Sequence, residues 1–409
     1  MKIIGGLGRE KVGDHGGFII DTDKAGNNTE FLKPLVWRDD SKTGGDISGG
    51  EGDPYLRELR TPIDVLALEN EIFFATRSGI LVYDIIKKEY ARQIAVCTDQ
   101  PLQRLRTHGN LVLFPDKRQG TLSSSLVLGL QPFTEEGITK TFYPRELQIA
   151  DVAASQFEQR PELSSFKPKI NITSLDDALV YYSQEHLVKT NIYLPSEKRE
   201  DYFFMKSSKR LDDLVMLHAL ADPKRIFAIQ ESPEKKALSL LVFDEDLEMR
   251  KEIPLDDLGV FPPHDSITAF TTYTQKETST RKSSVFIAFG TANGYFSLCL
   301  YSEDTGKPLK KIVGGYFHDP NEPPDKEINH RINKIIPKID LNGKKSELFL
   351  SMDEILLGVK INSLSLLSQK TSALREYLIP TYYDHFKEGV TIYGEFPKKI
   401  SCFDFQQKK

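Results

Sequence analysis

Three short strand-like runs follow one another between Ile72 and Ile94, and this stretch constrains the fold more than any other part of the chain. The runs are Ile72 to Thr76, Ile80 to Ile85 and Tyr90 to Ile94. Each run is rich in β-branched or aromatic residues, and glycine or charged residues occupy the gaps, a pattern typical of antiparallel hairpins. The stretch therefore predicts a meander of short antiparallel strands.

The same order of residue types returns further along the chain. Leu240-Leu-Val-Phe-Asp244, followed by EMRKEI, matches Ile80-Leu-Val-Tyr-Asp84, followed by EYARQI. The segment VFIAFGTANGYFSLCLY also parallels IFFATRSGILVY, because a Thr-x-x-Gly turn separates two apolar runs in both. Recurrence of one supersecondary unit predicts a repeat architecture.

Six such units are predicted, and the two ends of the chain supply a seventh. The six run from Thr61 to Val96, Leu102 to Tyr143, Ile170 to Lys206, Leu211 to Pro254, Ser266 to Val313 and Arg331 to Pro380. Two strands within Gly16 to Trp37 and two at the C-terminus, Thr391 to Phe396 and Ile400 to Phe405, are expected to share one sheet. Pairing of the first and last strands closes a ring and removes open sheet edges.

The units are unevenly spaced, on the order of fifty residues apart, so the number of units could also be six or eight instead of seven. One segment departs from the strand pattern: Ile149, Ala153 and Phe157 recur at i, i+4 and i+8. This spacing predicts one short inserted helix near residues 146–158.

The run FFATRSGILVYD, a strand, a turn and a strand ending in aromatic-Asp, resembles a blade of the WD40-like and quinoprotein-like β-propeller superfamily. The chain contains no Trp-Asp and no Gly-His dipeptide, so the WD40 signature is absent. The resemblance therefore concerns the propeller architecture and indicates no particular family. It implies an all-β, seven-bladed β-propeller in which residues 1–409 form a single domain. Residues 38–60, rich in Gly and Asp, are expected to form a flexible loop.

Composition narrows the class of protein. The net charge of -5 argues against a protein built to hold nucleic acid, because neutralising phosphates needs an excess of Lys and Arg. Three distant cysteines, Cys97, Cys299 and Cys402, form no metal knuckle or disulfide framework. The sequence shows no signal peptide and no apolar run of roughly 20 residues. We therefore expect a cytoplasmic protein with no nucleic-acid partner and no membrane association.

Polar residues precede several of the predicted first strands. In a propeller, the loops that enter the innermost strands open onto one face, so these residues are expected to converge there. They are His264 and Asp265, His330 and Arg331, Asp384 and His385, and, in other units, Arg60, Arg104 and Asp212. Such a ring could hold an anionic ligand, supply a general base, or bind a divalent metal through His264, His330 and His385. No cofactor is predicted.

Two further patterns are assigned to turns. Gly5, Gly6 and Gly8 lack the strand-to-helix setting and the Gly-Lys-Ser/Thr ending of a phosphate loop. The segment from Asp21 to Gly26 begins like a calcium loop, but its later ligand positions hold Ala25 and Leu32.

Two functions follow from this pattern. The first is a protein-interaction scaffold whose loops contact another protein, because a recognisable fold lacks a complete catalytic constellation. The alternative is an enzyme, or a small-ligand or metal-binding propeller, that uses the His/Asp/Arg cluster at the channel mouth.

Overall fold

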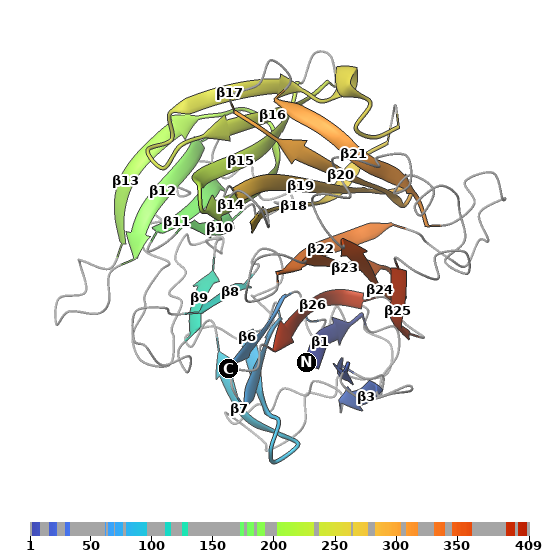
Figure 1. Cartoon of the computed structure of the whole chain (residues 1–409). Coiled ribbons are helices and arrows are strands. Elements are labelled where there is room, and N and C mark those ends of the chain that lie inside the picture. Colours follow the sequence, from blue (N-terminus) through green and yellow to red (C-terminus); the bar gives the residue numbers. More distant parts are fainter. Residues whose placement is uncertain are drawn as a thin grey trace. The chain divides into compact units, whose positions relative to one another are not determined.

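The part of the chain that the computed structural model describes consists mainly of antiparallel β-strands (Figure 1). The described residues are 2–8, 16–22, 29–32, 62, 64–68, 70–76, 79–95, 111–115, 125–129, 172–175, 178–183, 186–192, 203–232, 237–262, 265–276, 283–303, 308–317, 331–339, 346–361, 390–396 and 400–406. Within these ranges the only helix is the short 3-10 helix η4 (Asp256–Leu258). The all-β prediction is confirmed.

The chain divides into two compact units. The first unit comprises Met1–Ile170, Thr190–Lys206 and Lys398–Lys409, and the second comprises Asn171–Lys189 and Ser207–Pro397. Each unit has buried apolar clusters of its own.

Four-stranded antiparallel sheets with strands paired in chain order make up the second unit. Three are complete within it: β14 (Leu214–Ala221), β15 (Lys224–Glu231), β16 (Leu238–Phe243) and β17 (Met249–Pro254); β18 (Ile267–Lys276), β19 (Ser283–Thr291), β20 (Tyr295–Tyr301) and β21 (Leu309–Tyr316); β22 (Ile332–Ile339), β23 (Ser346–Met352), β24 (Ile355–Ile361) and β25 (Val390–Glu395). A fourth sheet begins in this unit with β10 (Ile172–Leu175) and β11 (Ala178–Ser183), and continues with β12 (His186–Ile192) and β13 (Phe203–Arg210). The strand units predicted from Ile170, Leu211 and Ser266 are therefore confirmed as four-stranded sheets.

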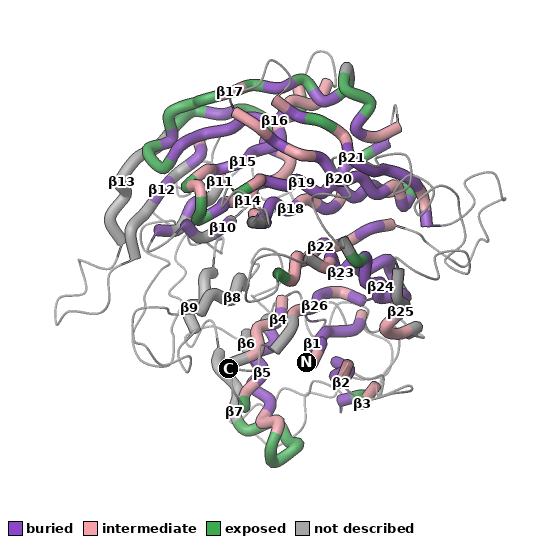
Figure 2. Tube along the Cα trace, in the orientation of Figure 1, coloured by how far each residue is buried: buried purple, intermediate pink, exposed green. Residues whose placement is uncertain are grey.

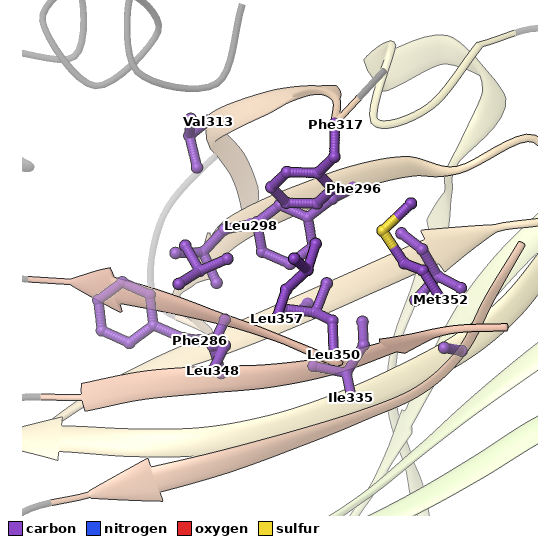
Figure 3. Packing of buried hydrophobic residues seen from close by; sticks show 14 of the residues in the cluster. Phe286, Phe296, Leu298, Val313, Phe317, Ile335, Leu348, Leu350, Met352 and Leu357 are labelled. Carbon is purple, nitrogen blue, oxygen red and sulfur yellow. The ribbon is translucent and has the colours of Figure 1, made fainter. Parts of the chain in front are cut away.

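Apolar side chains fill the space between successive sheets of the second unit. Phe286 and Phe296 of one sheet pack against Leu348 and Leu350 of the next (Figure 3). Burying such a side chain stabilises the fold by roughly 1.5–3 kcal/mol. Burial is concentrated on the middle strands β15 and β19, whereas β17 keeps exposed positions along its length (Figure 2). Each sheet therefore covers the face of its neighbour.

The first unit contains a sheet built from both ends of the chain. Its order is β26 (Ile400–Gln406), β1 (Lys2–Leu7), β2 (Gly17–Asp21) and β3 (Thr29–Leu32). A second sheet contains β4 (Asp64–Leu68), β5 (Glu71–Thr76), β6 (Gly79–Asp84) and β7 (Glu89–Ala95), and β8 (Leu111–Pro115) pairs with β9 (Ser125–Gly129). The two four-stranded sheets share one apolar cluster that includes Ile4, Phe74 and Tyr83.

The predicted pairing of the chain ends is correct, but the division of strands is different. Three N-terminal strands and one C-terminal strand form the shared sheet, instead of two and two. The predicted strand from Thr391 to Phe396 is β25, and it completes the sheet of β22 to β24. The prediction was wrong because sequence pattern reports that a strand exists and does not report its pairing partner.

Gly5 and Gly6 lie in a strand and not in a turn, whereas Gly8 directly follows the end of that strand. Gly5 and Gly6 belong to β1 and pair with Phe18 and Gly17 of β2. A Cβ at Gly5 would lie 2.2 Å from the Phe18 ring, and one at Gly6 would lie 2.5 Å from Pro62 Cβ. Glycine is required here because neighbouring groups approach the backbone closely.

Several predicted segments lie outside the described residues. They are the helix near 146–158, the loop 38–60, the ALREYLI run of the sixth unit, and the first and last strands expected between Leu102 and Tyr143. The structure describes β8 and β9, two of the strands predicted between Leu102 and Tyr143.

Candidate functional site

Of the polar residues that the sequence predicts to form a ring, the structure describes Asp265, Arg331 and Asp212. Asp265 lies just before β18, Arg331 just before β22, and Asp212 just before β14. This is the position in the repeat that the sequence predicts for each. His264, His330, His385, Asp384, Arg60 and Arg104 lie outside the described residues. The convergence of the full set stays a prediction.

Asp265 is a buried carboxylate with little hydrogen bonding. Asp265 is 7% exposed. Oδ1 accepts a long hydrogen bond of 3.3 Å from the Asn293 amide in the β19–β20 turn, and Oδ2 is buried without a hydrogen-bond partner. Burying a carboxylate oxygen that accepts no hydrogen bond costs free energy. Such an oxygen therefore either destabilises the fold or accepts a hydrogen bond from, or binds, an added ligand or cation.

Two tyrosines surround this end of the sheet. Tyr295 and Tyr316 make an edge-to-face contact, with ring centroids 5.0 Å apart. Burial, followed by the negative charge of Asp265, raises the pKa of Tyr316. Lys311 donates to the Tyr295 hydroxyl at 3.2 Å and also to the Gly259 carbonyl. These contacts hold the loop before β18 against the ends of β20 and β21.

His218 lies in the middle of β14, where it was not singled out from the sequence. Its Nδ1 lies 2.7 Å from Thr272 Oγ1, and its Nε2 lies 3.4 Å from Thr271 Oγ1, both on β18. His218 is half-buried as a residue, and loss of hydration lowers the pKa of its imidazole to about 4. The imidazole is therefore neutral near pH 7, and it can donate through one nitrogen and accept through the other.

Side chains tie the first strands of successive sheets to one another in the second unit. The Ala219 amide of β14 donates to Thr173 Oγ1 of β10 at 3.1 Å. His218 connects β14 to β18, and Thr268 Oγ1 of β18 donates to the Ile332 carbonyl of β22 at 2.6 Å. The signal for these residues in the sequence was a polar residue inside an otherwise apolar strand, as in LVMLHALA.

The Cys299 thiol is part of the packed interior of the second unit. Cys299 is buried and free, and desolvation raises the pKa of its thiol to about 12, so it is protonated at neutral pH. The ranges that the structure describes contain no group of three His, Cys, Asp or Glu side chains arranged to hold a metal ion. None of their helices is long and apolar enough to cross a membrane.

No protein-family model and no curated protein matches the chain. Among solved structures, a protein from Lactobacillus plantarum is 10% identical over 99% of both chains, with a TM-score of 0.49. Hsv2 of Kluyveromyces lactis is 11% identical over 84% of this chain and 90% of its own, with a TM-score of 0.45. The dihydro-heme d1 dehydrogenase NirN is 13% identical over 89% and 71%, with a TM-score of 0.41. Likeness at this level assigns neither a family nor an activity.

Proposed function

We propose that the chain is a β-propeller that serves as a protein-interaction scaffold. The observation that supports this most is the set of side-chain hydrogen bonds joining β10, β14, β18 and β22. These bonds place the first strands of four consecutive meanders side by side, as the blades of a propeller require. Pairing of β26 with β1 also supports the proposal, because a sheet shared by two distant parts of the chain is one way in which a propeller ring closes. With six four-stranded sheets and the β8–β9 pair, seven blades fit the sequence.

The scaffold role follows from how the buried polar groups are used. His218, Thr271 and Thr272 are engaged in holding sheets together, and the Cys299 thiol is shielded. A propeller whose first strands are joined by such bonds suits the binding of another protein, because a rigid surface avoids the entropic cost of ordering on association.

Affinity purification of the tagged full chain tests this function. We expect at least one protein to co-purify in a fixed ratio and to rebind the purified chain directly. Failure to recover any binding protein, together with a stoichiometric metal or small ligand in the purified chain, would reject the scaffold in favour of the alternative.

The alternative is ligand binding at the end of the sheets that bears Asp265 and Arg331. The buried Asp265 Oδ2 without a hydrogen-bond partner favours it, because an added donor or cation would satisfy that oxygen. Elemental analysis of the purified protein, repeated with His264→Ala and His330→Ala, tests this candidate. It predicts a bound divalent metal, or stabilisation by a ligand, that both variants lose.

A further inference from the structure

Asp265 is a buried carboxylate whose charge no described cation neutralises. The residue is 7% exposed, and its Oδ2 is buried without a hydrogen-bond partner. Its Oδ1 accepts one long bond, of 3.3 Å, from the amide of Asn293. None of the ion pairs between described residues includes Asp265. Because a buried charge is costly unless it is paired, an added cation at Oδ2 would be bound favourably.

The corresponding aspartate of the neighbouring sheet is paired with an arginine. Asp212 lies two residues before β14, as Asp265 lies two residues before β18. Arg210 donates through Nε to Asp212 Oδ1 at 3.4 Å. The residue that takes the place of Arg210 before Asp265 is Pro263, which carries no charge. The chain thus supplies a guanidinium at the first of these positions and a proline at the second.

Two tyrosines make the surroundings of Asp265 suitable for an organic cation. Burial, followed by the negative charge of Asp265, raises the pKa of Tyr316, so the carboxylate lies within electrostatic reach of that hydroxyl. Tyr316 and Tyr295 are both half-buried, and their rings meet edge to face. Lys311 Nζ lies 5.7 Å from the centre of the Tyr295 ring. This aromatic pair therefore already holds one cation, which its faces attract.

The chemistry of these groups favours a guanidinium over a metal ion. A divalent metal needs several ligands, and the described residues contain no group of three His, Cys, Asp or Glu arranged to hold one. A guanidinium needs one carboxylate and gains from aromatic neighbours. It is also more weakly hydrated than an ammonium, so it loses less by leaving water. Ser266 and Asn293, which flank Asp265 in the chain and across its hydrogen bond, are exposed, so the carboxylate lies close to solvent.

We propose that Asp265 receives the guanidinium of an arginine from a partner protein, beside Tyr295 and Tyr316. Oδ2 then accepts a charge-assisted hydrogen bond from this group, and Oδ1 has a lone pair left for a second one. The partner thereby supplies at Asp265 what Arg210 supplies at Asp212. This proposal rests on the scaffold function and names the chemistry of the partner for that function.

Titration with a small arginine probe tests the site before a partner is known. The probe is N-acetyl-arginine methylamide, and N-acetyl-citrulline methylamide is an uncharged control of nearly equal shape. The Asn293 amide donates to Asp265, so its NMR signal in protein with isotope-labelled asparagine reports on the carboxylate. Asn293→Gln identifies that signal by its loss. We expect a saturable shift with the arginine probe, with a Kd on the order of 1 mM for so small a contact, and little shift with citrulline.

Two variants locate the binding. Asp265→Asn removes the charge and keeps the size of the side chain, so we expect the affinity for the probe to fall about tenfold or more. Asp246→Asn removes a charge from the exposed β16–β17 turn and should bind the probe as the parent chain does. If Asp265→Asn fails to fold, the comparison of the two probes on the parent chain still decides. Equal binding of both probes, or equal affinity of Asp265→Asn and the parent chain, would overturn the proposal.

The protein that co-purifies with the chain completes the test. Its affinity should fall about tenfold or more with Asp265→Asn and stay unchanged with Asp246→Asn. Binding of the arginine probe without any effect of Asp265→Asn on that protein would assign the site to a free guanidinium compound and overturn the partner contact.

Other occupants of the site give distinct results. A saturable shift of the Asn293 signal with Ca²⁺ or Zn²⁺, and none with the arginine probe, would replace the guanidinium with a metal ion. A shift with neither would assign Oδ2 to a buried water molecule. Both results would overturn the arginine contact and leave the scaffold function standing, because recovery of a binding protein tests that function separately.

Discussion

His218 Nδ1 lies 2.7 Å from the hydroxyl of Thr272, so one hydrogen bond joins the first strands of two neighbouring sheets. Because Nε2 also lies near Thr271, both ring nitrogens are used for contacts with β18. The contact makes His218 a connector between sheets rather than a free base.

Replacing His218 should therefore weaken the second unit. His218→Ala removes the connection and leaves two buried threonine hydroxyls short of a partner, and we expect a loss of about 1–3 kcal/mol in the free energy of unfolding. Urea denaturation measures this. Thr272→Val in the His218→Ala background should cost less than in the parent chain, because the shared bond is already gone. Strictly additive effects of the two changes would contradict the connection.

The same residue predicts how stability depends on pH. Since the pKa of His218 is lowered from 6.5 to about 4 in the folded protein, the unfolded chain binds a proton first as the pH falls. The neutral His218 therefore contributes fully to the stability of the folded protein above about pH 6.5. Between about pH 6.5 and pH 4 the free energy of unfolding falls progressively, by roughly 3 kcal/mol in total. Denaturation in the parent chain and in His218→Gln across this window should show a steeper decline in the parent. Parallel curves would contradict the prediction.

Glycine in β1 predicts a strong steric effect. A Cβ at Gly5 would meet Phe18 at 2.2 Å and the Cys402 carbonyl at 2.9 Å, so Gly5→Ala must displace a buried ring or the adjoining strand β26. We expect a loss of about 1–3 kcal/mol or more. Gly259→Ala is the matched control, because nothing lies within 4 Å of its Cβ and only its left-handed φ of 57° is strained, costing about 1–2 kcal/mol. Thermal unfolding of both variants should show the larger loss for Gly5→Ala.

A bidentate ion pair connects β15 with the turn that follows β20. Arg225 donates through Nε and Nη2 to Glu303 Oε1 and Oε2 at 2.9 and 2.8 Å. Arg225 lowers the pKa of Glu303, so its contribution is present above the unfolded pKa and is lost as the pH falls below it. A double-mutant cycle with Arg225→Met and Glu303→Gln should give a coupling of about 0.5–1 kcal/mol, because both side chains keep some contact with water. A coupling of zero at low salt would contradict it.

The sequence predicted the strands well wherever the pattern was local. The echo between Ile80-Leu-Val-Tyr-Asp84 and Leu240-Leu-Val-Phe-Asp244 corresponds to a shared structure, since both aspartates close the following turn. Asp265 and Arg331 could be placed before their first strands because those strands begin where the apolar runs begin.

The pairing of strands and the side-chain hydrogen bonds between sheets could not be predicted from the sequence pattern. The assignment of β25 to the sheet of β22 depends on contacts between residues far apart in the chain. The turn predicted at Gly5 and Gly6 was wrong because glycine marks both turns and close backbone approaches. His218 was missed because one histidine within an apolar strand gives no sign of the hydroxyls it meets on another sheet.

The pairing of Ile3 with Phe405 has a consequence for how the molecule is made. During synthesis, β1 emerges long before its partner β26, because all the other described strands lie between them in the chain. Until β26 has been synthesised, one side of β1 has no strand to receive its hydrogen bonds, and that edge is open to other chains. A nascent chain of this protein is therefore vulnerable to aggregation at β1, and synthesis of β26 ends that exposure.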